Sequence, residues 1–178
     1  MTDATLGPSS FIVLGLLAQR GPGTSYDLKR WADQSVGYFW TFPRSQLYAE
    51  PQRLVSLGLL TERQEETGRR RRLFQVTDAG RTALQEWLNA PAGMPELRDL
   101  GLLKLFFISG QDSVTLQQLA REQWQLHQGR LQEYQQLERD LTAQAVAATP
   151  LQTIRMGLLY ERANIAFWQE VLDSVSLE

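Results

Sequence analysis

Four consecutive arginines, Arg69 to Arg72, are the side chains in this sequence that most clearly suggest a chemistry. They lie in the stretch EETGRRRRLFQVTDAG and use four of the 18 lysines and arginines of a chain whose formal net charge is −2. Guanidinium groups are permanent cations that hold phosphate or carboxylate groups through paired hydrogen bonds. Because adjacent like charges repel, the run indicates a surface that an anion neutralises.

The rest of the basic charge lies in the same half of the chain. Residues 1–89 carry 11 lysines and arginines against 9 acidic residues, whereas residues 90–178 carry 7 against 11. Eight arginines fall between Arg44 and Arg81. This distribution favours an anion-binding face on the N-terminal half.

Composition excludes several other classes of protein. With 43% hydrophobic and 21% charged residues the chain is typical of a globular protein, and without cysteine it has no disulfide or thiolate chemistry. No apolar run is long enough to span a bilayer and the N-terminus lacks the basic start of a signal peptide, so we expect a cytoplasmic protein without a membrane partner.

Catalysis and cofactor binding have no sequence support. The chain contains no nucleophile elbow, phosphate loop, metal cluster or histidine-paired carboxylate, so we expect neither an enzyme nor a cofactor. His127 is the only histidine, and we expect it to be packed or hydrogen-bonded rather than bound to a metal.

The arginine run must be positioned by the elements around it. Apolar spacing and turn residues predict three helices, the first capped by Ser9 or Ser10 and stopped by Gly21-Pro22-Gly23. Two β-prone runs then flank a turn at Gly68, and a fourth helix follows. The predicted ranges are 11–19, 24–34 and about 43–58 for the helices, 59–64 and 72–76 for the strands, and 78–88 for the fourth helix.

The segment NAPAGMP, residues 89–95, reads as a linker, so we expect two domains, 1–89 and 90–178. Beyond it the pattern is entirely helical. An apolar helix over 96–109 should be buried on more than one side, a long helix follows over 113–144, and a last one begins at Pro150 with Thr149 as its cap. Because the last helix is apolar on two sides, we expect a second subunit to cover it.

The order of these elements predicts a mostly α-helical protein with an N-terminal winged helix-turn-helix, a two-stranded wing, and a C-terminal all-helical dimerisation domain. In a winged helix the third helix enters the major groove of DNA, and the tip of the hairpin touches the flanking backbone or the minor groove. The recognition helix would be about 43–58 and the arginine-rich wing about 65–72. Double-stranded DNA is therefore the predicted anion.

Several motifs carry a resemblance to a known family. The segments QLYAEPQRLVSLGLL, FQVTDAG and FIVLGLLAQRGPGTSYDLKR resemble the PadR family of bacterial transcriptional regulators, and LRDLGLLKLFFISG onward is similar to its virulence-activator-type C-terminal domain. The resemblance implies a homodimer, most often a repressor, that binds a palindromic operator and is released by a small molecule. It also implies dimerisation through the C-terminal helices, with the first helix against the partner. The chain departs from the pattern at Ser25, where glycine is common, and at Pro51, which should kink the recognition helix.

The predicted DNA contacts follow from side-chain chemistry. Gln46 can bind adenine and Arg44 guanine, while Ser45 and Tyr48 can reach phosphate. Alternatively Tyr48 packs inside the domain and Arg44 is a solvated charge. Arg53 would hold a phosphate or an intradomain carboxylate. Arg69, Arg70 and Arg71 would contact phosphates, unless the run is only a solvated loop, while Arg72 would lay its stem over the core.

Two further hypotheses concern ligands and partners. Trp124, Tyr134, Phe167 and Trp168 could bind a small aromatic or hydrophobic effector, although such residues more often form a core or a dimer interface. Glu161 and Arg162 could form an ion pair at an interface or orient a polar ligand. An alternative function for the whole chain is a winged-helix module for protein–protein assembly, whose wing binds an acidic partner rather than DNA.

Overall fold

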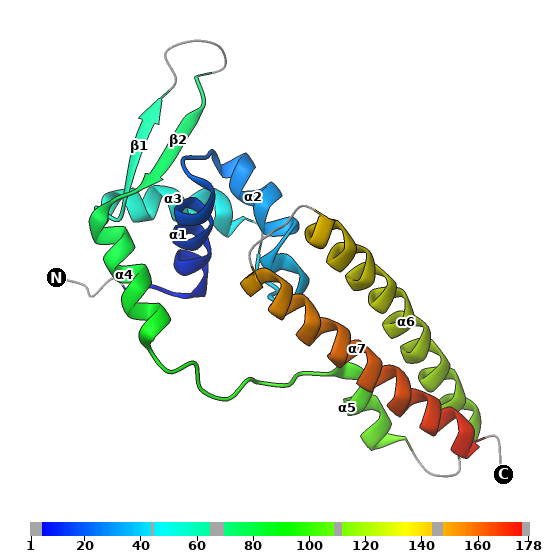
Figure 1. The fold of residues 1–178 in the computed structure, drawn as a ribbon. Coiled ribbons are helices and arrows are strands. Elements are labelled where there is room, and N and C mark those ends of the chain that lie inside the picture. The colour runs from blue at the N-terminus through cyan, green and yellow to red at the C-terminus, as the bar shows by residue number, and fades with distance from the viewer. Residues whose placement is uncertain (1–4, 44, 65–69, 109–111, 144–147, 176–178) are drawn as a thin grey trace. The chain divides into compact units, whose positions relative to one another are not determined.

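The computed structural model describes residues 5–43, 45–64, 70–108, 112–143 and 148–175. The chain divides into two compact units, Met1–Gly93 and Met94–Glu178 (Figure 1). The elements of the first unit are α1 Pro8–Arg20, α2 Ser25–Asp33, the short 3₁₀ helix η1 Val36–Tyr38, α3 Gln46–Ser56, β1 Leu60–Gln64, β2 Arg72–Val76 and α4 Asp78–Asn89.

The ends of α1 and α2 follow from local side chains. α1 begins at Pro8 with Gly7 as its N-cap, so the predicted cap at Ser9 or Ser10 is wrong. Ser10 acts instead from the third helical position, where its hydroxyl accepts a hydrogen bond from the Gly7 backbone N–H at 3.2 Å. Gly21, with φ of 85°, ends α1 as predicted, because glycine adopts this conformation without steric cost. Thr24 caps α2 by accepting from the Asp27 N–H at 3.2 Å.

α3 is shorter than predicted and contains a proline. It runs from Gln46 to Ser56, and its end is set by Gly58, whose φ of 73° places a glycine just past the helix. Pro51 lies inside α3 and is among the fully buried side chains. Its ring therefore packs into the domain instead of interrupting the helix.

The core of the first unit joins α1, α2 and α3 to the sheet. It is built from side chains that are almost completely buried: Val13, Leu14 and Leu17 of α1, Leu28 of α2, Leu47 and Leu54 of α3, Leu60 of β1, and Phe74 and Val76 of β2. Truncating one such leucine to alanine typically costs about 2–5 kcal/mol. This core fixes which faces of α3 and of the hairpin remain outside.

The wing is an antiparallel pair whose base is tied to the α1–α2 loop. Leu60 pairs with Val76 and Gln64 with Arg72. Gly23 adds a bridge, with its N–H donating to Phe74 O at 3.1 Å and its carbonyl accepting from Phe74 N at 2.9 Å. A side chain on Gly23 would force the Trp31 ring to shift, because a Cβ would lie 2.5 Å from it.

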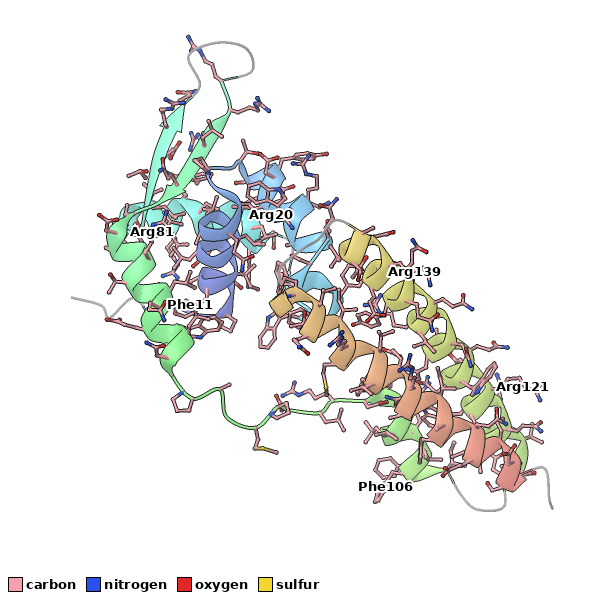
Figure 2. The ribbon with its side chains drawn as sticks, viewed as in Figure 1. Phe11, Arg20, Arg81, Phe106, Arg121 and Arg139 are labelled. Atoms are coloured by element: carbon pink, nitrogen blue, oxygen red, sulfur yellow. The ribbon has the colours of Figure 1, made fainter. Side chains whose placement is uncertain are left out.

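α4 closes the unit against α1. The Phe11 and Trp87 rings stack with centroids 4.6 Å apart, and Phe11 is labelled in Figure 2. Gly80 allows α4 to approach the turn between α3 and β1, since a Cβ there would lie 2.2 Å from the Leu59 carbonyl oxygen.

The described part of the second unit is helical. It contains α5 Leu100–Phe107, α6 Ser113–Ala143 and α7 Ala148–Val175, with α6 and α7 packed along one another (Figure 1). α7 begins two residues before the predicted Pro150, so Thr149 lies within the helix and its side chain is outside the described residues. Leu119, Ala120 and Trp168 form a small buried cluster, and Tyr134, Ile154 and Leu158 are buried elsewhere in the pair.

The prediction that α5 is buried on more than one side is wrong for the single chain. Leu100, Leu103, Phe106 and Phe107 are all exposed, Phe106 at 82%, and Phe106 projects away from its helix in Figure 2. Only its opposite side packs, with Leu102 and Leu105 against the Trp168 cluster. An exposed apolar face of this kind is typical of an interaction surface.

Candidate nucleic-acid interface

α3 exposes one polar face because its apolar residues recur every three or four positions. Leu47, Pro51 and Leu54 are buried, which leaves Ser45, at the N-cap, and Tyr48 outside. Tyr48 is 54% exposed, so the alternative in which it packs inside the domain is wrong. Its hydroxyl belongs to a surface that a ligand can reach, whereas Arg44 lies outside the described residues.

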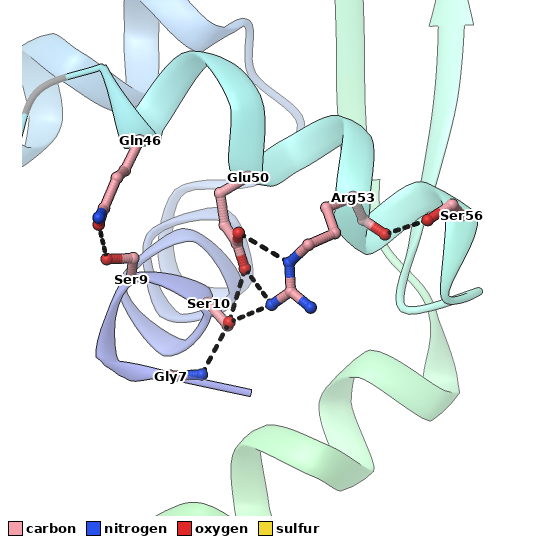
Figure 3. Close-up of polar contacts among 7 residues, drawn as sticks. All are labelled: Gly7, Ser9, Ser10, Gln46, Glu50, Arg53 and Ser56. Atoms are coloured by element: carbon pink, nitrogen blue, oxygen red, sulfur yellow. Dashed lines mark hydrogen bonds and ion pairs between the residues drawn. The ribbon is translucent and has the colours of Figure 1, made fainter. Parts of the chain in front are cut away.

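Gln46 is exposed at the start of α3 and contacts α1. Its Oε1 accepts a hydrogen bond from the Ser9 hydroxyl (Figure 3). Reading adenine requires both the carbonyl and the amino group of a glutamine. To bind a base in this way, Gln46 would have to turn its carbonyl away from Ser9.

Arg53 is engaged by an internal carboxylate. Its Nη2 donates to Glu50 Oε1 at 2.7 Å and to the Ser10 hydroxyl at 2.9 Å, while its Nε donates to Glu50 Oε2 at 2.9 Å (Figure 3). The Ser10 hydroxyl also donates to Glu50 Oε1 at 2.6 Å. Of the two roles considered for Arg53, the structure therefore contains the intradomain carboxylate, and α3 is fastened to the start of α1.

The electrostatics of this cluster reflect its partial burial. Desolvation would raise the pKa of Glu50, but hydrogen bonds from Arg53 and Ser10 outweigh it and hold that pKa below its ordinary value. The hydrogen bond to Glu50 raises the pKa of Arg53. Both groups are thus charged at neutral pH and act as a fixed pair.

The described part of the wing exposes arginines just beyond the paired strands. Arg70 and Arg71 are both exposed, and Arg70 has a φ of 47°, a left-handed conformation that is uncommon outside glycine. Gln64 Nε2 donates to the Arg70 carbonyl at 3.3 Å, which supports this turn of the backbone. Arg69 and the predicted turn at Gly68 lie outside the described residues.

Arg71 lies close to a carboxylate of α2. Burial would raise the pKa of Asp27, but hydrogen bonds from Thr24 and the charges of Arg30 and Arg71 lower it overall. Arg71 is therefore partly balanced within the unit. A phosphate at this position would compete with Asp27 for the same guanidinium.

The expectation that Arg72 lays its stem over the core is wrong. Its side chain is 61% exposed, and its Nε lies 3.3 Å from Glu62 Oε1 on the neighbouring strand. It also donates to Gln52 of α3 at 3.1 Å. Sequence reasoning missed Gln52, although its position four residues after Tyr48 places it on the same helical face.

The four candidate effector residues do not gather around one cavity. Trp168 is completely buried beside Trp124, and Phe167 meets it edge-on with ring centroids 5.1 Å apart. Tyr134 packs elsewhere, under Arg130 and against Gly157, where a Cβ would lie 2.7 Å from its ring. A separate open hollow of about 570 Å³ is lined by Leu100, Leu103, Lys104, Phe107, Ile108, Thr115, Gln118, Leu119 and Glu122, which include none of the four.

Glu161 pairs with a residue other than the expected one. It is buried, and its Oε2 lies 2.6 Å from His127 Nδ1, whereas Arg162 is exposed. His127 is thus hydrogen-bonded, as expected, but its partner is a carboxylate, so the expectation that the chain has no histidine-paired carboxylate is wrong. In the part of the chain that the structure describes, no three His, Cys, Asp or Glu side chains are grouped to hold a metal ion.

Comparison with known proteins decides the family. Residues 13–86 match the model of the transcriptional regulator PadR-like family, and residues 97–176 match that of the virulence activator alpha C-terminal domain. The negative transcriptional regulator PadR of Bacillus subtilis (strain 168) is 30% identical over 138 residues, covering 76% of this chain and 75% of PadR. This chain belongs to the PadR family. It is a PadR-family transcriptional regulator, and the family is not enzymatic.

Solved structures share the fold over nearly the whole chain. B. subtilis PadR in complex with operator DNA superposes with a TM-score of 0.85 at 24% identity, covering 96% of this chain and 99% of that one. The same protein with p-coumaric acid gives 0.79 at 24% identity, over 97% and 99%. The Vibrio cholerae virulence activator AphA gives 0.74 at 29% identity, over 95% and 98%. The predicted fold class, winged helix-turn-helix followed by helices, is confirmed.

Within the described ranges of this PadR-family chain, no helix is both long and apolar enough to cross a bilayer.

Proposed function

We propose that this protein is a homodimeric repressor that binds a palindromic operator through α3 and the arginine wing. The observation that carries the proposal is the combination of an exposed polar face on α3, with Ser45, Gln46 and Tyr48, and exposed Arg70 and Arg71 on the wing of the same compact unit. Polar side chains on a helix can read base edges, and arginines beside it can neutralise phosphates. Arg44 and Arg69 would add to these two groups.

The division of labour follows the two halves of the chain. Residues 1–89 would bind DNA, and residues 90–178 would dimerise and hold an effector. A relative, B. subtilis PadR, is a negative regulator that has been solved both with operator DNA and with p-coumaric acid. By analogy, a small aromatic or hydrophobic molecule would release this protein from DNA. Such a regulator works in the cytoplasm.

The case for a dimer comes from apolar surface in the second unit. Leu103, Phe106 and Phe107 of α5 are exposed, and so are Leu159 and Ala163 of α7. Leaving this much apolar surface in water is unfavourable, and a second copy would cover it. A twofold dimer presents two symmetry-related copies of the recognition helix, so the operator should be palindromic.

A mobility-shift titration on the DNA upstream of the protein's own coding region tests the proposal. The intact protein should shift this fragment in the presence of excess random DNA, and its mass in solution should be that of a dimer. A protein that shifts both DNAs equally, or neither, would favour the assembly module in which the wing binds an acidic protein. Release of the complex by an aromatic acid would support the effector.

A further inference from the structure

Gln52, Glu62 and Arg72 form a closed ring of polar contacts between α3 and both strands of the wing. Gln52 Nε2 donates to Glu62 Oε2 at 2.8 Å. Arg72 Nη1 donates to Gln52 Oε1 at 3.1 Å, and Arg72 Nε lies 3.3 Å from Glu62 Oε1. Each side chain therefore contacts the other two, and each comes from a different element.

The ring lies between the two groups of side chains proposed to meet DNA. Gln52 follows Tyr48 by one helical turn on the exposed face of α3. Glu62 is paired with Phe74 and Arg72 with Gln64, so Glu62 and Arg72 are diagonal neighbours on one face of the hairpin. Arg72 also directly follows the exposed Arg70 and Arg71.

The chemistry of the ring favours positioning over base reading by Gln52. A glutamine that reads adenine presents its carbonyl and its amino group together to the base. Here the Oε1 of Gln52 is taken by Arg72 and its Nε2 by Glu62, while these two side chains are paired with each other. The amide thus joins α3 to an ion pair on the hairpin, and rotating it toward a base would break both contacts.

We propose that Gln52, Glu62 and Arg72 are positioning residues that set the angle between α3 and the wing, so that both can bind one duplex at once. The proposal rests on the proposed DNA-binding function. When two contact groups are held in their bound arrangement beforehand, binding loses less conformational freedom. Because the Arg72 side chain is 61% exposed, and exposed ion pairs contribute little to folding, the ring should affect DNA binding more than stability.

The test compares DNA affinities of Gln52→Ala, Glu62→Ala and the double variant on the upstream fragment. Each single variant should bind about two- to tenfold more weakly, the range expected for ordering one side chain at an interface. The double variant should bind no more weakly than the singles, because both changes break the same ring. The salt dependence should stay that of the wild type, since no phosphate contact is removed.

Three features make the comparison sharp. Removing a carboxylate near DNA would by charge alone strengthen binding, so weaker binding by Glu62→Ala has the opposite sign to a simple charge effect. Arg72→Lys keeps the charge but loses the planar fork, so it should also bind more weakly. Gln75→Ala is the matched control, because Gln75 is an exposed glutamine of β2 on the opposite face of the hairpin from Arg72 and should bind like the wild type.

Three results would overturn the proposal. Wild-type affinity in both Gln52→Ala and Glu62→Ala, with unchanged circular dichroism, would show that the ring does not position the wing. Weaker binding by Gln52→Ala with tighter binding by Glu62→Ala would make Gln52 a direct base reader that Glu62 restrains. A wild-type protein that binds no DNA would refute the proposed function itself, and the positioning proposal with it.

Discussion

Arg70→Gly tests the wing at a residue whose backbone makes the substitution clean. Arg70 has a φ of 47°, which glycine adopts without steric cost, so the guanidinium is removed without straining the hairpin. The side chain is exposed, and surface substitutions usually change stability by no more than about 0.5 kcal/mol. Any large change in DNA binding should therefore come from the lost charge.

The expected magnitude follows from counting contacts. Each phosphate contact contributes about −0.9 to the slope of log K against log salt on duplex DNA. A dimer carries two wings, so losing one contact per wing should flatten that slope by about 2, on operator and random DNA alike. Arg71→Ala should flatten it less, because Asp27 already attracts this guanidinium.

Fluorescence-anisotropy titrations between about 50 and 200 mM salt measure the slope. Arg81→Ala is the matched control, since Arg81 is an exposed arginine of the same unit that belongs to α4 and not to the wing. An unchanged slope in folded Arg70→Gly would mean that the arginines are only a solvated loop. Equal flattening by Arg81→Ala would mean that overall charge matters and the position of the wing does not.

Four other changes have defined outcomes. Gln46→Ala should weaken binding to the operator by about 1–3 kcal/mol and should change binding to random DNA little, as measured by competition titrations. An equal loss of affinity for operator and random DNA would show that Gln46 does not read a base. Phe106→Asp should convert the proposed dimer to a monomer in sedimentation experiments, and a wild-type monomer at micromolar concentration would contradict the proposed interface. Gly80→Ala should lower the unfolding free energy by about 1–3 kcal/mol, because its Cβ meets the Leu59 carbonyl; a neutral result in denaturant titrations would show that α4 can shift. Glu50→Gln should cost about 1–3 kcal/mol at neutral pH by weakening the pair with Arg53. The pKa of Glu50 is held below its ordinary value of 4.5, so the stabilisation is complete above that value and is lost as the pH falls through the folded-state pKa. The unfolding free energies of the variant and the wild type should therefore converge in acid. A difference that stays constant with pH would argue against the pair.

Local patterns were enough to predict the elements of the fold. Alternation in RLFQV and helical spacing of Leu47 and Leu54 predicted β2 and α3, because burying one face is a local property of the sequence. The ends of α1 and α3 were also local signals. Gly21 and Gly58 mark them because each adopts a positive φ, which glycine tolerates best. The start of α1 was misplaced because Ser10 looked like a cap.

Long-range polar contacts could not be predicted in this way. Ser10 bonds with Glu50, 40 residues away, and Glu161 with His127, 34 residues away. Nothing in the local pattern distinguishes these buried pairs from solvated side chains, and Glu161 next to Arg162 suggested the wrong partner. The role of Arg72 was missed likewise, because its contacts with Glu62 and Gln52 depend on how the hairpin lies on α3.

Footprinting of the intact protein on the DNA upstream of its own coding region tests most directly whether α3 and the wing form an operator-binding surface. The protected region should contain two inverted half-sites whose centres are about 10–10.5 base pairs, or a multiple of this, apart, because a twofold dimer meets the same face of the duplex. Protection should be lost in Gln46→Ala at concentrations that protect with the wild type. Uniform protection without half-sites, or none at micromolar protein, would contradict the account.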